Sequence, residues 1–140
     1  MTANQYETYD PEKHGRDTPQ EVFGPVVKVD KHEDGQIHVI TMNRPHRMNS
    51  IGDGLGEALH DAFAEFRDDP TARVAILTGE GDRAFSAGAD LIATSETRKA
   101  QAESGDSSGY RAPRTNKSIV PMAEGMNLWK PTIAAVNGFA

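Results

Sequence analysis

The stretch Val74–Asp90, VAILTGEGDRAFSAGAD, decides how this chain folds. Its first five residues, Val74–Thr78, are apolar or β-branched, which is typical of a buried strand. Gly79 and Gly81 then turn the chain at the carboxyl end of that strand, the end at which α/β folds bind ligands. The loop that follows has small side chains except for Phe85, so a ligand can approach its bare N–H groups closely. The alternative is a plain tight turn between strand and helix, and the local pattern alone favours that turn.

Two apolar runs ahead of this stretch predict a β-hairpin. They are Val26–Asp30 and Ile37–Met42, and Asp34-Gly35 between them is a strong turn signal. The segment before them, Met1–Phe23, is polar and carries prolines and many charges, which is typical of a flexible or loosely packed arm. In this arm His14 is expected to be solvated. The predicted domains are therefore the arm at 1–23 and a folded unit at 24–140.

An amphipathic helix is predicted between the hairpin and the central strand. Apolar residues recur at helical spacing from Ile51 to Phe66, the helix runs to about Asp68, and a proline at position 70 closes it. Ser50 followed three residues later by Asp53 resembles a capping box, which places the helix start near Ile51.

The chain after the central stretch predicts further elements. Asp90 suits the N-cap of a helix that begins at Leu91. Lys117–Trp129 is expected to be helical, with Ile119, Met122, Met126 and Trp129 on one face. Thr132–Val136 is then a second short apolar strand, and a turn follows it.

Composition excludes several classes of protein. The 140 residues carry a formal charge of -6, from 15 basic and 21 acidic side chains, which argues against nucleic-acid binding and against an anionic membrane surface. No cysteine is present, so disulfides, thiolate metal sites and cysteine nucleophiles are excluded, and no metal site is expected. No apolar run approaches the roughly 20 residues of a membrane span and no signal core opens the chain, so a cytoplasmic protein is expected.

Four blocks occur in order with suitable spacing and carry a family resemblance. They resemble the N-terminal half of the crotonase superfamily, and enoyl-CoA hydratases most closely, over about Val26 to Ala140. The blocks are Ile40–Pro45 (ITMNRP), Val74–Gly79, Ala84–Leu91 (AFSAGADL) and Lys130–Gly138 (KPTIAAVNG), with the amphipathic helix between the first two.

The resemblance implies an α/β fold built as a spiral of ββα units, incomplete at the C-terminus. It implies an acyl-CoA thioester as substrate, with coenzyme A as part of that substrate and no other cofactor, and homotrimers commonly paired into hexamers. The matching oxyanion donor is the backbone N–H of Ala89. The matching CoA and substrate contacts are Ser86, Ala87, Ala89, Asp90, Leu91 and Ile92, although Ile92 replaces a lysine often found there.

Arg47 has two interpretations that the sequence leaves open. Its position just after Asn-Arg-Pro matches a basic residue that often contacts CoA phosphates, and His46 is the other candidate for that match. Local pattern alone favours a solvated loop charge, since arginine is mostly exposed. The resemblance brings the two interpretations level.

The expected chemistry is addition of water to an α,β-unsaturated acyl-CoA, with backbone N–H groups stabilising the enolate oxygen. The family's second N–H donor and its two catalytic glutamates match no residue up to Ala140, so they are expected in a C-terminal half, in cis or on a second chain. Two alternatives remain open. One is another crotonase-type enzyme, an isomerase, hydrolase or decarboxylase, and the other is a non-catalytic half-domain that binds CoA.

Overall fold

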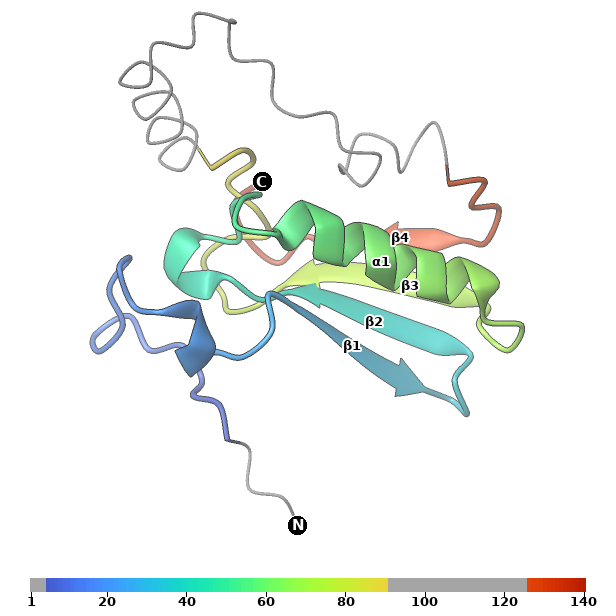
Figure 1. Ribbon diagram of the computed structural model, residues 1–140, viewed down its shortest axis with the longest axis horizontal. Coiled ribbons are helices and arrows are strands. Elements are labelled where there is room, and N and C mark those ends of the chain that lie inside the picture. The colour runs from blue at the N-terminus through green and yellow to red at the C-terminus, as the bar shows by residue number, and fades with distance from the viewer. Residues whose placement is uncertain (1–4, 91–125) are drawn as a thin grey trace, which may run out of the picture.

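The computed structural model describes residues 5–90 and 126–140, in which one long helix lies across a four-stranded mixed sheet (Figure 1). This arrangement confirms the predicted α/β class. The elements are η1 (Gln20–Val22), β1 (Val27–His32), β2 (Ile37–Met42), η2 (Pro45–Arg47), α1 (Leu55–Asp68), β3 (Val74–Gly79) and β4 (Thr132–Ala134), and η1 and η2 are single 3-10 turns.

The sheet has the spatial order β1-β2-β3-β4. β1 and β2 form the predicted antiparallel hairpin, and its turn places Gly35 at a φ of 87°, a conformation that glycine adopts without strain. β2 and β3 are parallel, with Ile40 opposite Leu77, because α1 carries the chain back across the sheet between them. β4 adds in parallel to β3, with Ile76 opposite Ile133. It is shorter than the predicted Thr132–Val136.

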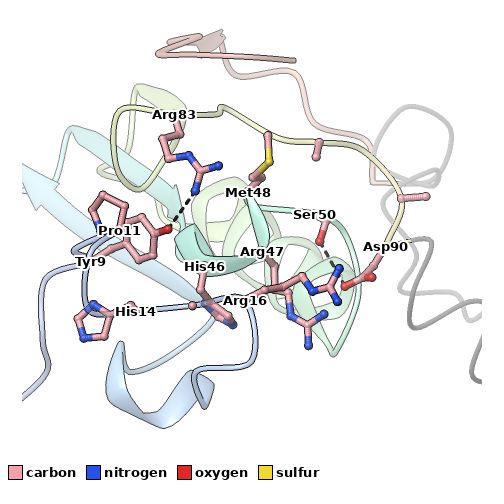
Figure 2. A pocket seen from close by; sticks show the side chains of 13 residues that line it. Tyr9, Pro11, His14, Arg16, His46, Arg47, Met48, Ser50, Arg83 and Asp90 are labelled. Carbon is pink, nitrogen blue, oxygen red and sulfur yellow. Dashed lines mark hydrogen bonds between the residues drawn. The ribbon is translucent and has the colours of Figure 1, made fainter.

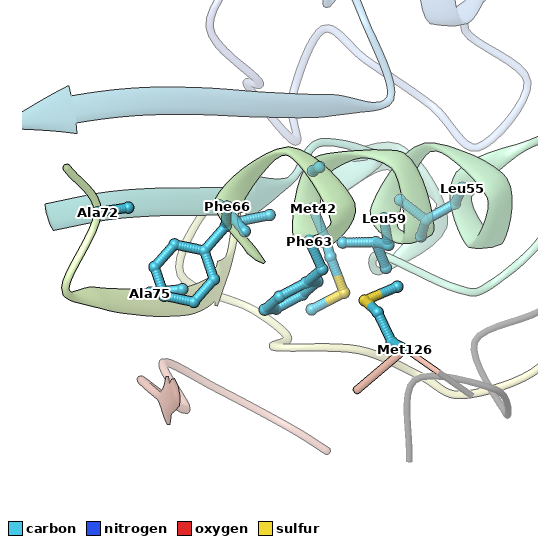
Figure 3. Close-up of a cluster of buried hydrophobic side chains, with 10 residues drawn as sticks. Met42, Leu55, Leu59, Phe63, Phe66, Ala72, Ala75 and Met126 are labelled. Atoms are coloured by element: carbon cyan, nitrogen blue, oxygen red, sulfur yellow. The ribbon is translucent and has the colours of Figure 1, made fainter. Parts of the chain in front are cut away.

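The core lies between α1 and one face of the sheet (Figure 3). The helical spacing seen in the sequence is responsible, because it directs one apolar stripe of α1 onto the sheet, where β1 and β2 lie nearest to it. Burial of each large apolar side chain contributes about 1.5–3 kcal/mol. The buried cluster consists of Ile40, Met42, Leu55, Leu59, Ala62, Phe63, Phe66, Ala72, Ala75 and Met126.

The start of α1 differs from the prediction. The helix begins at Leu55, after Gly54 in a left-handed conformation, and no side chain caps it. The predicted capping box is wrong because Ser50 and Asp53 both bond to another residue, the buried Arg44. A local cap pattern therefore gives way to a tertiary ion-pair network.

The described residues near the C-terminus also correct a prediction. Residues 126–129 are not helical, so the predicted helix Lys117–Trp129 is wrong over its last four residues, and 117–125 lie outside the described residues. Met126 is buried in the core, whereas Trp129 is 91% exposed. Ile133 and Phe139 are exposed apolar side chains farther along the chain.

The polar segment ahead of β1 packs against η2 through aromatic side chains. Phe23 is buried, and its ring stacks on His46 with centroids 5.0 Å apart and an interplanar angle of 18°. His14 meets the same Phe23 ring edge-on at 5.1 Å, and Tyr9 lies 6.0 Å from it. His14 is 8% exposed, so the expectation that it is solvated is wrong.

Candidate functional site

A cleft of about 550 Å³ opens where three segments of the chain meet. The segments are the N-terminal arm, η2 with the turn after it, and the loop between β3 and Asp90 (Figure 2). The loop follows the carboxyl end of β3, which is where the sequence predicted a ligand site. The lining residues are Tyr9, Pro11, His14, Gly15, Arg16, His46, Arg47, Met48, Ser50, Arg83, Ala87, Ala89 and Asp90.

Asn49 holds the loop in place beneath the cleft. Its side-chain amide donates to the carbonyl oxygens of Ala84, at 2.8 Å, and Glu80, at 3.1 Å. Its Oδ1 accepts the backbone N–H of Arg44 at 3.0 Å. Asn49 and its neighbour Met48 both have a φ of 52°, a left-handed conformation that is uncommon outside glycine. These bonds keep the turn after η2 in that conformation, against its usual cost.

Ser86 belongs to the scaffold of the loop. Its hydroxyl donates to the carbonyl oxygen of Asn49 at 2.9 Å and accepts the N–H of Gly88 at 3.1 Å. The next residue, Ala87, donates its N–H to the carbonyl of Met48 at 2.9 Å. Ser86 is not among the residues that line the cleft, so its hydroxyl supports the loop from below.

Ala89 has a backbone geometry that suits it to donate to a ligand. It pairs with Ile51 in an isolated parallel bridge, in which Ile51 N–H donates to Gly88 O at 2.7 Å and Asp90 N–H donates to Ile51 O at 3.0 Å. In such a bridge the paired residue itself directs its N–H to the opposite side. Within residues 5–90 and 126–140 the Ala89 N–H has no hydrogen-bond acceptor, and Ala89 is exposed in the wall of the cleft.

Arg44 fixes the far end of this wall from the interior. It is 2% exposed, and its guanidinium donates to the Asp90 carboxylate at 3.2 and 3.3 Å and to the carbonyl of Ser50 at 2.6 Å. It also bonds to the carboxylate of Asp53. The Ser50 hydroxyl donates to the same Asp90 oxygen at 3.2 Å (Figure 2). The predicted role of Asp90 as a helix N-cap concerns Leu91 onward, outside the described residues, whereas its contacts with Arg44 are plain.

The cleft is cationic although the chain as a whole is acidic. Arg16, Arg47 and Arg83 line it, and Asp90, the carboxylate in its wall, contacts the buried Arg44. Burial lowers the pKa of His46 below the usual 6.5, and the positive charges of Arg44 and Arg47 lower it further. His46 is therefore neutral at pH 7 and stacks as an uncharged ring, so the arginines set the charge of the cleft.

The predicted site residues separate into three groups. Arg47, Ala87, Ala89 and Asp90 come together in the cleft. Ser86 lies behind it, and Leu91 and Ile92 lie outside the described residues.

Sequence reasoning missed the parts played by Arg44, Arg16, Arg83 and Tyr9. Arg44 follows a strand in the Asn-Arg-Pro block, which was a usable signal. The other three show no local pattern that distinguishes them from solvated residues.

The described residues contain neither a metal-binding cluster nor a membrane-spanning helix. No group of three or more His, Asp or Glu side chains in 5–90 and 126–140 is arranged to hold a metal ion. No helix in the same ranges is both long and apolar enough to cross a bilayer.

Comparisons with known proteins agree on one family. The family model described as enoyl-CoA hydratase/isomerase matches residues 32–140. A curated relative, carnitinyl-CoA dehydratase of Salmonella enteritidis, is 43% identical over 106 residues, which cover 76% of this chain.

Solved structures give the same result for the fold. Enoyl-CoA hydratase from Mycobacterium tuberculosis H37Rv matches with a TM-score of 0.61 and 31% identity, over 81% of this chain and 38% of that one. A carnitinyl-CoA dehydratase from Mycobacterium avium matches with a TM-score of 0.57 and 30% identity, over 81% of this chain and 40% of that one. The predicted crotonase-like fold is confirmed by these matches. The chain spans 36% of the length of the curated relative, so the match concerns part of that protein.

Proposed function

Because the chain belongs to the enoyl-CoA hydratase/isomerase family of the crotonase superfamily, we propose that the whole protein is an enoyl-CoA hydratase-like lyase. It adds water to the double bond of an α,β-unsaturated acyl-CoA thioester. The observation that carries this proposal is the Ala89 N–H, which lies in the cleft wall with no acceptor among the described residues, while both neighbouring peptide groups bond to Ile51.

The proposed role of Ala89 follows from the charge that moves in the reaction. Water loses a proton to a base as its oxygen bonds to the β-carbon. The electrons of the double bond then shift through the α-carbon to the thioester oxygen, and a proton is finally delivered to the α-carbon. The oxygen carries most of the negative charge in between, so an N–H aimed at it accelerates the step. Loss of one such donor typically costs about 2.7–4 kcal/mol.

The CoA part of the substrate is proposed to lie in the same cleft. Ala87 and Ala89 offer small side chains beside which a thioester can approach the backbone, and Arg47 offers a guanidinium for a phosphate. The Arg47 side chain is 23% exposed, which favours the phosphate-contact interpretation over that of a freely solvated charge. Asp90 is proposed to hold the wall in place rather than to transfer protons, because its carboxylate is bonded to Arg44.

Further groups complete the proposed machinery. A second N–H donor, the acid and base groups, and assembly into homotrimers or hexamers are proposed for the whole protein, with coenzyme A entering only as part of the substrate. Leu91 and Ile92 are proposed to continue the substrate-binding stretch. An isomerase, hydrolase or decarboxylase would use the same N–H donor with different acid and base groups.

A second candidate is the reverse reaction, dehydration of a hydroxyacyl-CoA. It is favoured by the 43% identity with a protein named carnitinyl-CoA dehydratase. Both directions pass through the same enolate and need the same donor, so the site supports either one. The substrate class separates the two candidates.

One experiment tests both candidates. In one assay the whole protein is incubated with crotonyl-CoA, and loss of the absorbance of the conjugated thioester is measured. In a separate assay it is incubated with carnitinyl-CoA, and an increase in the same absorbance is measured. Loss of absorbance with crotonyl-CoA supports the hydratase, and gain with carnitinyl-CoA alone supports the dehydratase. Absence of turnover with both, in a folded protein that binds CoA, would overturn the proposal in favour of another crotonase reaction or a non-catalytic binding domain.

A further inference from the structure

Arg16 reaches the cleft from outside the segment that matches the family model. It lies in the arm, 16 residues before that segment begins at residue 32, and it lines the cleft together with Arg47. We propose that Arg16 is a phosphate-binding residue for the nucleotide end of coenzyme A, so that the N-terminal arm forms one wall of the CoA site. This inference rests on the proposed function, because it takes an acyl-CoA as the ligand.

The arm fixes the backbone around Arg16 through a short series of contacts, while the Arg16 side chain itself is 62% exposed. A turn at Asp10–His14 is closed by the bond from His14 N–H to Asp10 O, at 2.8 Å, and by the bond from Asp10 N–H to His14 Nδ1, at 2.9 Å. The buried His14 ring packs edge-on against Phe23, and Phe23 stacks on His46, the residue next to Arg47. A second turn follows at once, closed by Thr18 N–H and Gly15 O at 3.1 Å, and Arg16 lies within it.

Arg16 and Arg47 both lie close to one carboxylate oxygen. Asp17 Oδ1 is 4.0 Å from Arg16 Nε and 3.9 Å from Arg47 Nη2, and Figure 2 shows both arginines directed into the cleft. These distances are too long for hydrogen bonds, and the Asp17 side chain is 88% exposed. Asp17 therefore neutralises the two guanidinium groups weakly, and a dianion between them would be held more strongly.

The geometry of the charged groups fits phosphate better than it fits a single carboxylate. Guanidinium groups present several N–H donors in a plane and bind phosphate oxygens in pairs. Arg83 adds a third positive charge to the lining, and its Nη1 donates to the Tyr9 hydroxyl at 3.0 Å, which ties it to the arm. Three arginines in one cleft of a chain with charge -6 indicate a polyanionic ligand. The nucleotide end of CoA, with its diphosphate and its 3′-phosphate, is such a ligand.

The test measures binding of adenosine 3′,5′-bisphosphate and of ADP to the whole protein by titration calorimetry. Arg16→Gln is expected to weaken binding of at least one probe by about tenfold, the effect typical of losing a hydrogen bond to a charged group. The bisphosphate carries the 3′-phosphate and ADP carries the diphosphate, so the probe that loses affinity identifies the phosphate. Lys13→Gln is the matched control, because Lys13 is an exposed cation of the same arm that does not line the cleft. Both substitutions remove one positive charge.

A second variant is expected to change the affinity for the probe in the opposite direction. Asp17→Asn removes the carboxylate that lies close to both arginines, so binding of the same probe is expected to tighten. Equal affinities for the wild type, Arg16→Gln and Lys13→Gln would overturn the inference. Equal weakening by Arg16→Gln and Lys13→Gln would also overturn it, since it would reveal only a general effect of net charge.

Kinetics separate this inference from the proposed function. With crotonyl-CoA, Arg16→Gln is expected to raise KM about tenfold with little change in kcat. With crotonyl-N-acetylcysteamine, which has no phosphate, the substitution is expected to change neither KM nor kcat. If the wild type is active and Arg16→Gln has the same KM for crotonyl-CoA as the wild type, the role of Arg16 is overturned and the proposed reaction stands. An inactive wild type would contradict the proposed reaction, and the calorimetric titration would still decide the role of Arg16.

Discussion

The guanidinium of Arg44 lies 3.2 Å from the carboxylate of Asp90, a residue 46 positions later, and both side chains are buried. This pair joins the end of β2 to the loop that carries Ala89. A buried charge that loses its partner costs far more than an exposed one, since no water replaces the lost bonds. The pair therefore controls both the stability of the fold and the position of the cleft wall.

Arg44→Met is expected to lower the free energy of unfolding of the whole protein by about 3–5 kcal/mol, because it removes the guanidinium that bonds to the buried Asp90 carboxylate and to the Ser50 carbonyl. Urea denaturation followed by circular dichroism measures the change. The matched control is Arg73→Met, since Arg73 is exposed and its change should stay within about 0.5 kcal/mol. Equal and small changes in both variants would contradict a structural role for the pair.

The Arg44–Asp90 pair also marks the limit of what the sequence predicts. β2, β3 and the end of α1 were predicted correctly because their signals, apolar runs and helical spacing, lie within the segments themselves. The start of α1 was predicted wrongly because Ser50 and Asp53 have the pattern of a cap yet bond to Arg44.

The site shows the same division between local and distant signals. Ala89 and Arg47 were identified from contiguous motifs, which the family resemblance interprets. Tyr9 and Arg83 are 74 positions apart, and no pattern within either segment indicates that they meet. Contacts of this kind depend on how the arm folds back over η2, which only the tertiary structure determines.

Gly79→Ala is expected to destabilise the protein by about 1–3 kcal/mol, the cost typical of overpacking. A Cβ at this position would lie 2.6 Å from Asn49 Nδ2 and 2.6 Å from the carbonyl oxygen of Phe85, and the second of these belongs to the backbone and cannot swing aside. The thermal midpoint of unfolding measures the effect. Gly15→Ala is the control, because a Cβ there meets no atom within 4 Å. If Gly79→Ala has the same thermal midpoint as Gly15→Ala and the wild type, the loop is free to shift away from Asn49.

Asp69, just after α1, is expected to make stability depend on pH in acid. The backbone N–H of Thr71, and then Lys31, lower the pKa of Asp69 from 3.8 to about 2. A carboxyl with a lowered folded-state pKa stabilises the fold fully above its unfolded pKa, and that contribution is lost as the pH falls through the folded pKa. The loss should therefore occur between about pH 4 and pH 2.

The measurement for Asp69 is the free energy of unfolding at several pH values in that interval. Asp69→Asn should have a shallower pH dependence than the wild type, whereas Asp30→Asn, at an exposed position of β1, should follow the wild-type curve. Parallel curves for the wild type and Asp69→Asn would show that the Thr71 and Lys31 contacts do not favour the ionised carboxyl.

Ala89→Pro tests the donor on which the proposed reaction rests. Proline has no N–H, and turnover of crotonyl-CoA is expected to fall by roughly 10²–10³, as for the loss of one oxyanion donor. The bridge to Ile51 uses Gly88 O and Asp90 N–H and leaves the Ala89 N–H unused, so the substitution removes none of its hydrogen bonds and the thermal midpoint should change little.

Ala87→Pro is the comparison for that variant, because the same substitution two residues earlier is expected to affect stability. The Ala87 N–H donates to Met48 O at 2.9 Å, so its loss should lower the thermal midpoint, as expected for a scaffold bond. The two variants are assayed side by side for turnover and melting, and a crystal structure of Ala89→Pro establishes whether the loop keeps its path. Unchanged turnover in Ala89→Pro with the loop intact would mean that Ala89 is no donor, and the match of this loop to the family's oxyanion motif would then be wrong.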